Sequence, residues 1–168
     1  MKRIALLIIF ACIAGCGKGP KHLSESDYGH GKTAFQLLEE NSAASPMSAT
    51  RTAAEGQIKE VTNYGLKMAL MNYSIAISDR GIATMSVHIA LNNIQMAELA
   101  KSLDAKQKWT AIYQERRQAL DELGPILKLC HDDAAQYFDE QAASTNTCAS
   151  SLEAYDTKYK ARFEDSPS

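Results

Sequence analysis

Mostly apolar side chains return at alternating steps of four and three residues along the middle of the chain, and this spacing restricts the fold more than any other feature. It puts each set on one stripe of an α-helix. The pattern predicts two long helices, 50–78 and 82–103, with a break at Gly81. The stripes expected to face the core are Ala54, Ile58, Val61, Gly65, Met68, Asn72 and Ile75 in the first helix, and Ile82, Met85, Ile89, Asn92, Met96, Leu99 and Leu103 in the second.

Shorter patterns of the same kind predict the other helices. They are 32–41, a third long helix capped by Asp104 and ended or kinked at Gly124 and Pro125, and two shorter helices at 126–138 and 152–163. In the third long helix the residues expected to face inward are Trp109, Ile112, Tyr113, Leu120 and Leu123, and those expected to face water are Glu115, Arg116, Arg117, Asp121 and Glu122. Alternation typical of strands is almost absent, so residues 32–168 are predicted to form one all-α domain, an antiparallel bundle of four to five helices.

The N-terminus has the pattern of an export signal. Residues 1–3 are a short basic start, and residues 4–13 are an apolar run of ten, too short for a bilayer, which takes about 20. The segment Ile13-Ala14-Gly15-Cys16 resembles the lipobox of bacterial lipoproteins. The resemblance covers residues 1–16. It implies that residues 1–15 are cleaved as a signal peptide and that Cys16 carries diacylglycerol on its sulfur and, usually, an acyl chain such as palmitate on its amine.

Lipid on Cys16 would anchor the chain to a membrane, because three acyl chains exceed the two anchoring signals that stable attachment needs. Gly17 stands where an Asp is associated with retention in the inner membrane of enteric bacteria. The outer membrane is therefore the expected location, with the domain in the periplasm. Residues 16–31 are rich in Gly, Ser and His and show little periodicity, so we expect a flexible stalk between the anchor and the domain.

Two cysteines remain for the folded part. Cys12 would leave with the signal and Cys16 would be lipidated, which leaves Cys130 and Cys148. An oxidising periplasm favours pairing of such a residual pair. The sequence therefore predicts a Cys130–Cys148 disulfide, with two separate free thiols as the alternative.

No catalytic, cofactor-binding or metal-binding residue is predicted, and we expect the protein not to be an enzyme. The segment Cys130-His131-Asp132-Asp133 gathers possible ligands, but adjacent helix positions point in different directions, whereas ligands on one face need spacings of three or four. The sequence has no Gly-rich phosphate loop, GxSxG motif or acidic calcium loop. A formal net charge of −2 provides no basic stripe, so no nucleic acid partner is expected.

Three features could serve protein binding. Tyr155, Tyr159 and Phe163 form an aromatic stripe that is a possible partner-binding face, with packing onto the bundle as the alternative. Asn92 interrupts an apolar stripe, where it could fix helix register, as single Asn residues do in coiled coils, or line a small cavity. Four methionines on the two central helices fit either an adaptable binding groove or an ordinary core: Met68, Met71, Met85 and Met96.

These expectations lead to three hypotheses of function. The first is a non-enzymatic binding or structural accessory of a cell-envelope machine, such as a secretion, pilus or conjugation apparatus. The second is an immunity or phage/plasmid exclusion lipoprotein that blocks an incoming agent. The third is a carrier of a small apolar ligand between helices. The anchor, the stalk and a helical domain without catalytic motifs favour the first.

Overall fold

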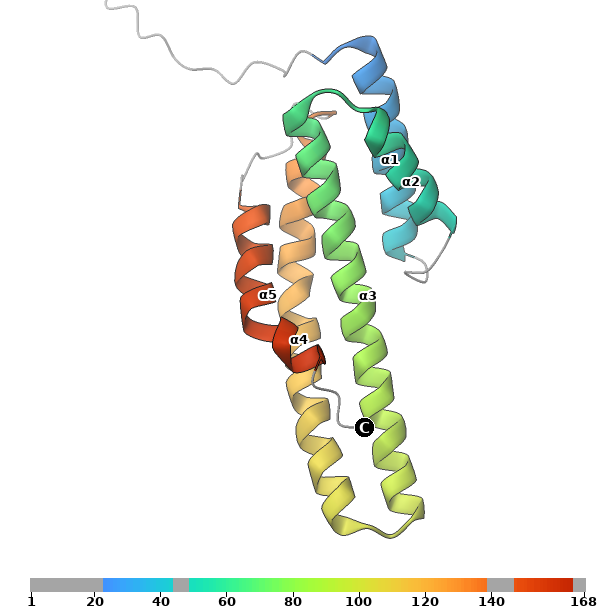
Figure 1. The fold of residues 1–168 in the computed structure, drawn as a ribbon, viewed down its shortest axis with the longest axis vertical. Helices are drawn as coiled ribbons and strands as arrows, with labels where there is room; N and C mark the ends of the chain where they lie inside the picture. The colour runs from blue at the N-terminus through green and yellow to red at the C-terminus, as the bar shows by residue number, and fades with distance from the viewer. Residues whose placement is uncertain (1–22, 44–48, 139–146, 165–168) are drawn as a thin grey trace, which may run out of the picture.

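Five helices make up the part of the chain that the computed structural model describes, residues 23–43, 49–138 and 147–164 (Figure 1). They are α1 (Glu25–Ala43), α2 (Ala49–Glu60), α3 (Tyr64–Leu99), α4 (Leu103–Ala135) and α5 (Cys148–Glu164). No strand occurs among these residues, and the predicted all-α bundle is confirmed. α3 and α4 form a long antiparallel hairpin. α1 and α2 pack beside the half of α3 that lies farther from the hairpin turn, and α5 lies along α4.

The first helix begins earlier than predicted, at Glu25. The Ser24 hydroxyl accepts a hydrogen bond from the Asp27 N–H (3.0 Å) and donates one to the Asp27 carboxylate (2.9 Å). This arrangement is a helix N-cap, so residues 25–31, expected to belong to the stalk, are helical. Gly31 reflects close packing and not chain flexibility, because a Cβ at this position would lie 2.6 Å from Leu66 Cδ2.

The chain turns at residues 61–63 and not at Gly81. The Asn63 side chain accepts a hydrogen bond from the Leu66 N–H (3.0 Å) and caps α3. The helix then runs through Gly81, which is buried inside it. The predicted position of the break was wrong because the apolar spacing continues across residues 61–63, whereas the capping residue decides where the helix starts.

A buried carboxylate connects α1 to this turn. Asp27 accepts hydrogen bonds from the backbone N–H groups of Thr62 (2.6 Å) and Asn63 (3.2 Å), and from the Thr62 hydroxyl (3.0 Å). The hydrogen bond from the Thr62 backbone is the main reason that the pKa of Asp27 lies below its ordinary value. The ionised form of Asp27 therefore stabilises the junction between α1 and α3.

We expect Asp27→Asn to lower the melting temperature near neutral pH. We also expect the melting temperature of the variant to fall less on acidification than that of the wild type. Because the folded-state pKa is lowered, this stabilisation is present above the ordinary value of 3.8 and is lost as the pH falls through the lowered pKa. An amide does not titrate, so the variant should lose less stability on acidification than the wild type. Thermal unfolding followed by circular dichroism at about pH 7 and about pH 3 measures both effects. The control is Glu25→Gln, an exposed carboxylate of the same helical turn, which should leave the pH profile unchanged.

A tight turn at residues 100–102 joins α3 to α4. Lys101 has a positive φ of 54°. The Ser102 hydroxyl accepts a hydrogen bond from the Ala105 N–H (3.4 Å), so Ser102 is the N-cap and not the predicted Asp104. α4 continues through Pro125, so one helix replaces the two that were predicted. Proline removes one backbone donor, but its fixed φ is helical, and packing on both sides of it holds α4 together.

Two clusters of buried side chains lie along the hairpin. The larger joins all five helices and includes Phe35, Leu38, Ile58, Leu66, Leu70, Tyr73, Ile77, Cys130 and Leu152. The smaller consists of Ala83, Ala119, Leu123, Tyr155 and Tyr159. Beyond the smaller cluster, in the described part of the chain, α3 and α4 continue to their turn as a pair with no third helix beside them (Figure 1).

Candidate functional site

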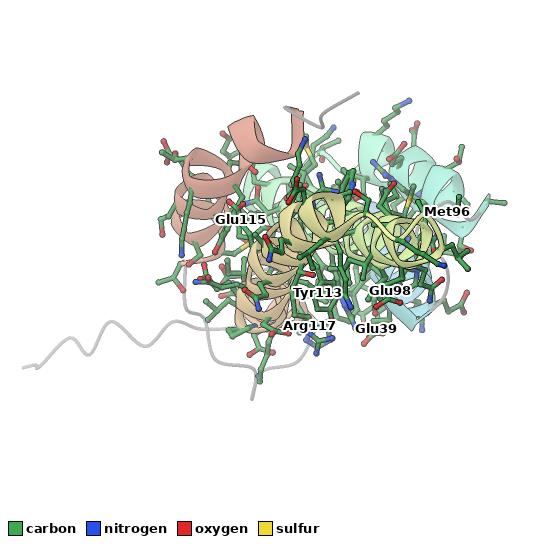
Figure 2. The ribbon with its side chains drawn as sticks, turned by 90° about the horizontal axis from the view of Figure 1, so that it is seen from below. Glu39, Met96, Glu98, Tyr113, Glu115 and Arg117 are labelled. Atoms are coloured by element: carbon green, nitrogen blue, oxygen red, sulfur yellow. A yellow bond between two sulfur atoms is a disulfide. The ribbon has the colours of Figure 1, made fainter. Side chains whose placement is uncertain are left out.

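The main surface feature is a row of exposed residues in the second half of α3, which we call the outer seam. Its members are Ile82, Met85, Ile89, Asn92, Met96 and Leu99. The five apolar side chains are 48% to 78% exposed. The prediction that this stripe faces the core was wrong. Figure 2 views the molecule along its long axis and shows Met96 on the side of α3 away from α4.

Small residues explain why the larger ones face outward. The side chains of α3 that are buried in this region include Ala83, Val87, Ala90 and Ala97. An alanine thus follows directly after Ile82, Ile89 and Met96. Alanine lets two helices approach closely, so α4 packs against the alanine stripe and leaves the neighbouring large residues in solvent.

Every member of the outer seam except Leu99 lies in a segment without formal charge. No Lys, Arg, Asp or Glu occurs from Gly81 to Ala97, and Arg80 and Glu98 stand at the two ends. Within the described ranges, no helix is long and apolar enough to cross a membrane. The outer seam is one apolar face of α3, and the alanine stripe beside it packs on α4.

A guanidinium is buried between the two helices of the hairpin. Arg116 is 5% exposed, and its Nη1 donates a hydrogen bond to the Ser86 carbonyl oxygen at 3.2 Å. Burial lowers the pKa of Arg116. The prediction that Arg116 faces water was wrong. Of the residues predicted to face inward, Leu123 is buried, whereas four are only half-buried: Trp109, Ile112, Tyr113 and Leu120. The interior of the hairpin is thus thin and partly polar.

The two cysteines of the folded part lie together, in agreement with the predicted disulfide. Cys130 of α4 and Cys148 at the start of α5 are disulfide-bonded, with their Cα atoms 4.7 Å apart. Both residues are buried in the larger core cluster. The Cys148 N–H also donates a hydrogen bond to Asp133 (3.1 Å), so the same part of α4 fixes the first turn of α5 twice.

The aromatic stripe of the last helix packs onto the bundle, the alternative given for it above. Tyr155 and Tyr159 are 6% and 2% exposed and belong to the smaller core cluster. Burial is the main reason that the pKa of Tyr155 is raised. A partner-binding role for these two tyrosines was therefore the wrong interpretation, and the Phe163 side chain lies outside the described residues.

The polar residues beside Cys130 hold helices together. His131 Nε2 lies 3.2 Å from Glu39 Oε1 of α1, and His131 Nδ1 lies 3.2 Å from Asp132 Oδ1. Lys128 Nζ lies 2.6 Å from Asp132 Oδ2. Among residues 23–43, 49–138 and 147–164, no group of three or more His, Cys, Asp or Glu side chains is arranged to hold a metal ion.

An open hollow lies along α4. It is lined by Tyr113, Gln114, Arg117, Gln118, Asp121, Glu122 and Pro125. Figure 2 labels Tyr113 and Arg117 at this surface. The hollow lies on one helix, whereas the carrier hypothesis places an apolar ligand between helices.

The predicted lipid-bearing residue, Cys16, lies outside the described residues. The described chain starts at Leu23, just before α1, at the end of the molecule opposite the turn between α3 and α4 (Figure 1). Comparison with protein-family models, with curated proteins and with solved structures finds no match to this chain.

Proposed function

We propose that this protein is a lipid-anchored accessory of the bacterial cell envelope that binds protein through its α3–α4 hairpin and has no enzymatic activity. The observation that carries the proposal is the outer seam, a row of five exposed apolar side chains on the hairpin surface with Asn92 among them. Soluble monomers rarely expose contiguous apolar patches beyond a few hundred Å², and larger ones mark sites of interaction. A helix with an exposed apolar stripe is a common form of protein-binding surface.

The arrangement of the molecule supports this role. α1 begins at one end and the hairpin turn lies at the other (Figure 1). At about 1.5 Å per residue, helices of 36 and 33 residues give the hairpin a length of roughly 50 Å. With lipid on Cys16 in the outer membrane, the hairpin would extend into the periplasm, where a component of a secretion, pilus or conjugation machine could meet it.

We expect Cys16→Ser to abolish labelling of the protein with palmitate and to leave residues 1–15 attached to the chain. The reason is that the serine hydroxyl cannot take the thioether-linked diacylglycerol that precedes cleavage. Metabolic labelling and the mass of the protein measure both effects. Cys12→Ser is the matched control, because Cys12 lies in the apolar run and should be removed with it. Labelling of the Cys16→Ser variant with palmitate would refute the anchor.

The binding role is tested with a photo-crosslinking amino acid at Leu103, which is 67% exposed next to the hairpin turn. The matched position is Lys108, an exposed residue of the same helix. Crosslinking in intact cells should join Leu103, and not Lys108, to one envelope protein in stoichiometric amount. No crosslinked envelope protein, together with protection of the cells against a toxin, phage or plasmid, would favour the exclusion hypothesis instead.

A further inference from the structure

We propose that the outer seam of α3 binds the same seam of a second copy of this chain, so that two hairpins form one four-helix bundle. The inference deepens the proposed function and rests on it for the use of the hairpin as a binding surface. It specifies the occupant of the middle of the seam, while the hairpin turn stays available to another protein.

The spacing of the seam is that of a coiled-coil interface. Ile82, Ile89 and Met96 recur at every seventh residue, and Met85, Asn92 and Leu99 recur at every seventh residue three positions later. These are the a and d positions of a heptad repeat. Their side chains insert between the side chains of a neighbouring helix, which can run parallel or antiparallel. The alanine stripe that packs on α4 has the same period, one position later. α3 therefore carries two heptad faces, of which α4 covers one.

In the described part of the chain the seam is exposed along its length, and it is chemically suited to a copy of itself. With no Lys, Arg, Asp or Glu from Gly81 to Ala97, two copies meet without repulsion between like charges. A strongly charged partner would find no opposite charge on this face. A second α3 instead offers apolar side chains of the same size and period.

Asn92 is the polar residue among five apolar ones in the seam. On the surface of a monomer, an exposed asparagine contributes little to the free energy of folding. Between two paired helices it would be costly unless its amide meets a polar group of the partner, and a single buried Asn is known to select register for this reason. Asn92 thus fixes helix register, as its position predicts, but the register is that between two chains and not that within the core of one chain.

The hairpin also lacks a second layer where the seam is exposed. Its interior there contains small residues and the buried Arg116, so its apolar burial is limited. A second hairpin laid on the seam would complete a four-helix bundle. The exposed surface of the five apolar seam residues with Met71 and Ile75 is on the order of 800 Å², close to what each partner contributes to a standard interface.

Crosslinking through Ile89 tests the pairing in the membrane. Ile89 lies near the middle of the seam, so it should approach its own copy whether the two helices run parallel or antiparallel. In full-length protein carrying Ile89→Cys, a short bis-maleimide should give a band of twice the monomer mass in isolated envelopes. Gln114→Cys, on the exposed side of α4, is the matched control and should stay monomeric. Cys130 and Cys148 are consumed by their disulfide and do not react.

Sedimentation of the mature chain, residues 16–168 with Cys16→Ser, measures the same association without the lipid. We expect a dimer, and we expect Ile82→Glu with Ile89→Glu to weaken dimerisation at least 100-fold, since each copy would bring two like charges to the seam. Both positions are solvent-exposed in a single chain, so the helical content of the variant should be unchanged. Gln114→Glu is the matched control for added charge and should sediment like the parent.

The outcomes separate this inference from the proposed function. A monomer by sedimentation, with no crosslink through Ile89, overturns self-association, while a crosslink through Leu103 to an envelope protein would still support the accessory role. A monomer that floats with anionic lipid vesicles, and loses this on Ile82→Glu with Ile89→Glu, shows that the seam binds a membrane surface and also overturns the inference. A dimer sensitive to the two glutamates supports it, whether or not Leu103 finds a partner.

Discussion

Removing the Cys130–Cys148 disulfide is expected to lower the free energy of unfolding by about 3 kcal/mol. The two residues are 18 positions apart in sequence. Crosslinking a loop of this length restricts the unfolded chain, and the entropy model for that restriction gives the stated magnitude. Among the described side chains of α5, few others are buried, chiefly Leu152, Tyr155 and Tyr159. Loss of the disulfide should therefore destabilise this helix first.

The experiment compares the parent with Cys130→Ala combined with Cys148→Ala. Alanine is preferred to serine because both positions are buried, and an added hydroxyl would need a partner there. Urea unfolding of the parent should shift to lower concentration on addition of reductant, and the double variant should no longer respond to it. Hydrogen exchange should be fastest in α5 of the variant. Equal stability of the oxidised parent and the variant would show that α5 is held by packing alone.

The disulfide and the fold class could be predicted from sequence because each depends on few assumptions. After the predicted lipidation of Cys16, Cys130 has one possible partner in an oxidising compartment. The helical class follows from the period of the apolar residues, which does not require knowing where any helix ends.

Helix boundaries were harder to predict because they depend on capping. The inward stripe of the first long helix was right for Ala54, Ile58 and Val61, which are buried. It was wrong from Gly65 onward, because the turn at residues 61–63 resets the rotation of the chain about the helix axis. Asn63 and Ser102 carry the signals that were missed, since each caps a helix through its side-chain oxygen.

The orientation of the second half of α3 could not be read from apolarity alone. Two stripes with the same heptad period run side by side there, one of large residues and one that includes Ala83, Ala90 and Ala97. Hydrophobicity favours burial of the larger stripe, whereas close packing of only two helices favours the smaller. Within one chain, the close packing of the two helices decides which stripe is buried. The larger stripe is thereby left exposed, which is why the candidate site and the failed prediction involve the same residues.

This inside–outside assignment predicts a large difference between two leucines of the same helix. We expect Leu70→Ala to lower the free energy of unfolding by about 2–5 kcal/mol, since Leu70 is 0% exposed and truncation leaves a cavity. We expect Leu99→Ala to change it by less than about 0.5 kcal/mol, since Leu99 is 78% exposed. The substitution and the helix are the same in both variants, so the difference between them reports burial.

Both variants are made in the Cys16→Ser chain that carries Ile82→Glu and Ile89→Glu, so that self-association through the outer seam does not add to stability. Chemical denaturation followed by circular dichroism gives the two free energies. Similar losses for Leu70→Ala and Leu99→Ala would mean that the outer seam is covered within a single chain. Restoring Ile82 and Ile89 should make Leu99→Ala costly in a concentration-dependent way, because Leu99 would then lose contacts with the second copy. A cost that appears only with the intact seam would tie the exposed stripe of α3 to association between chains.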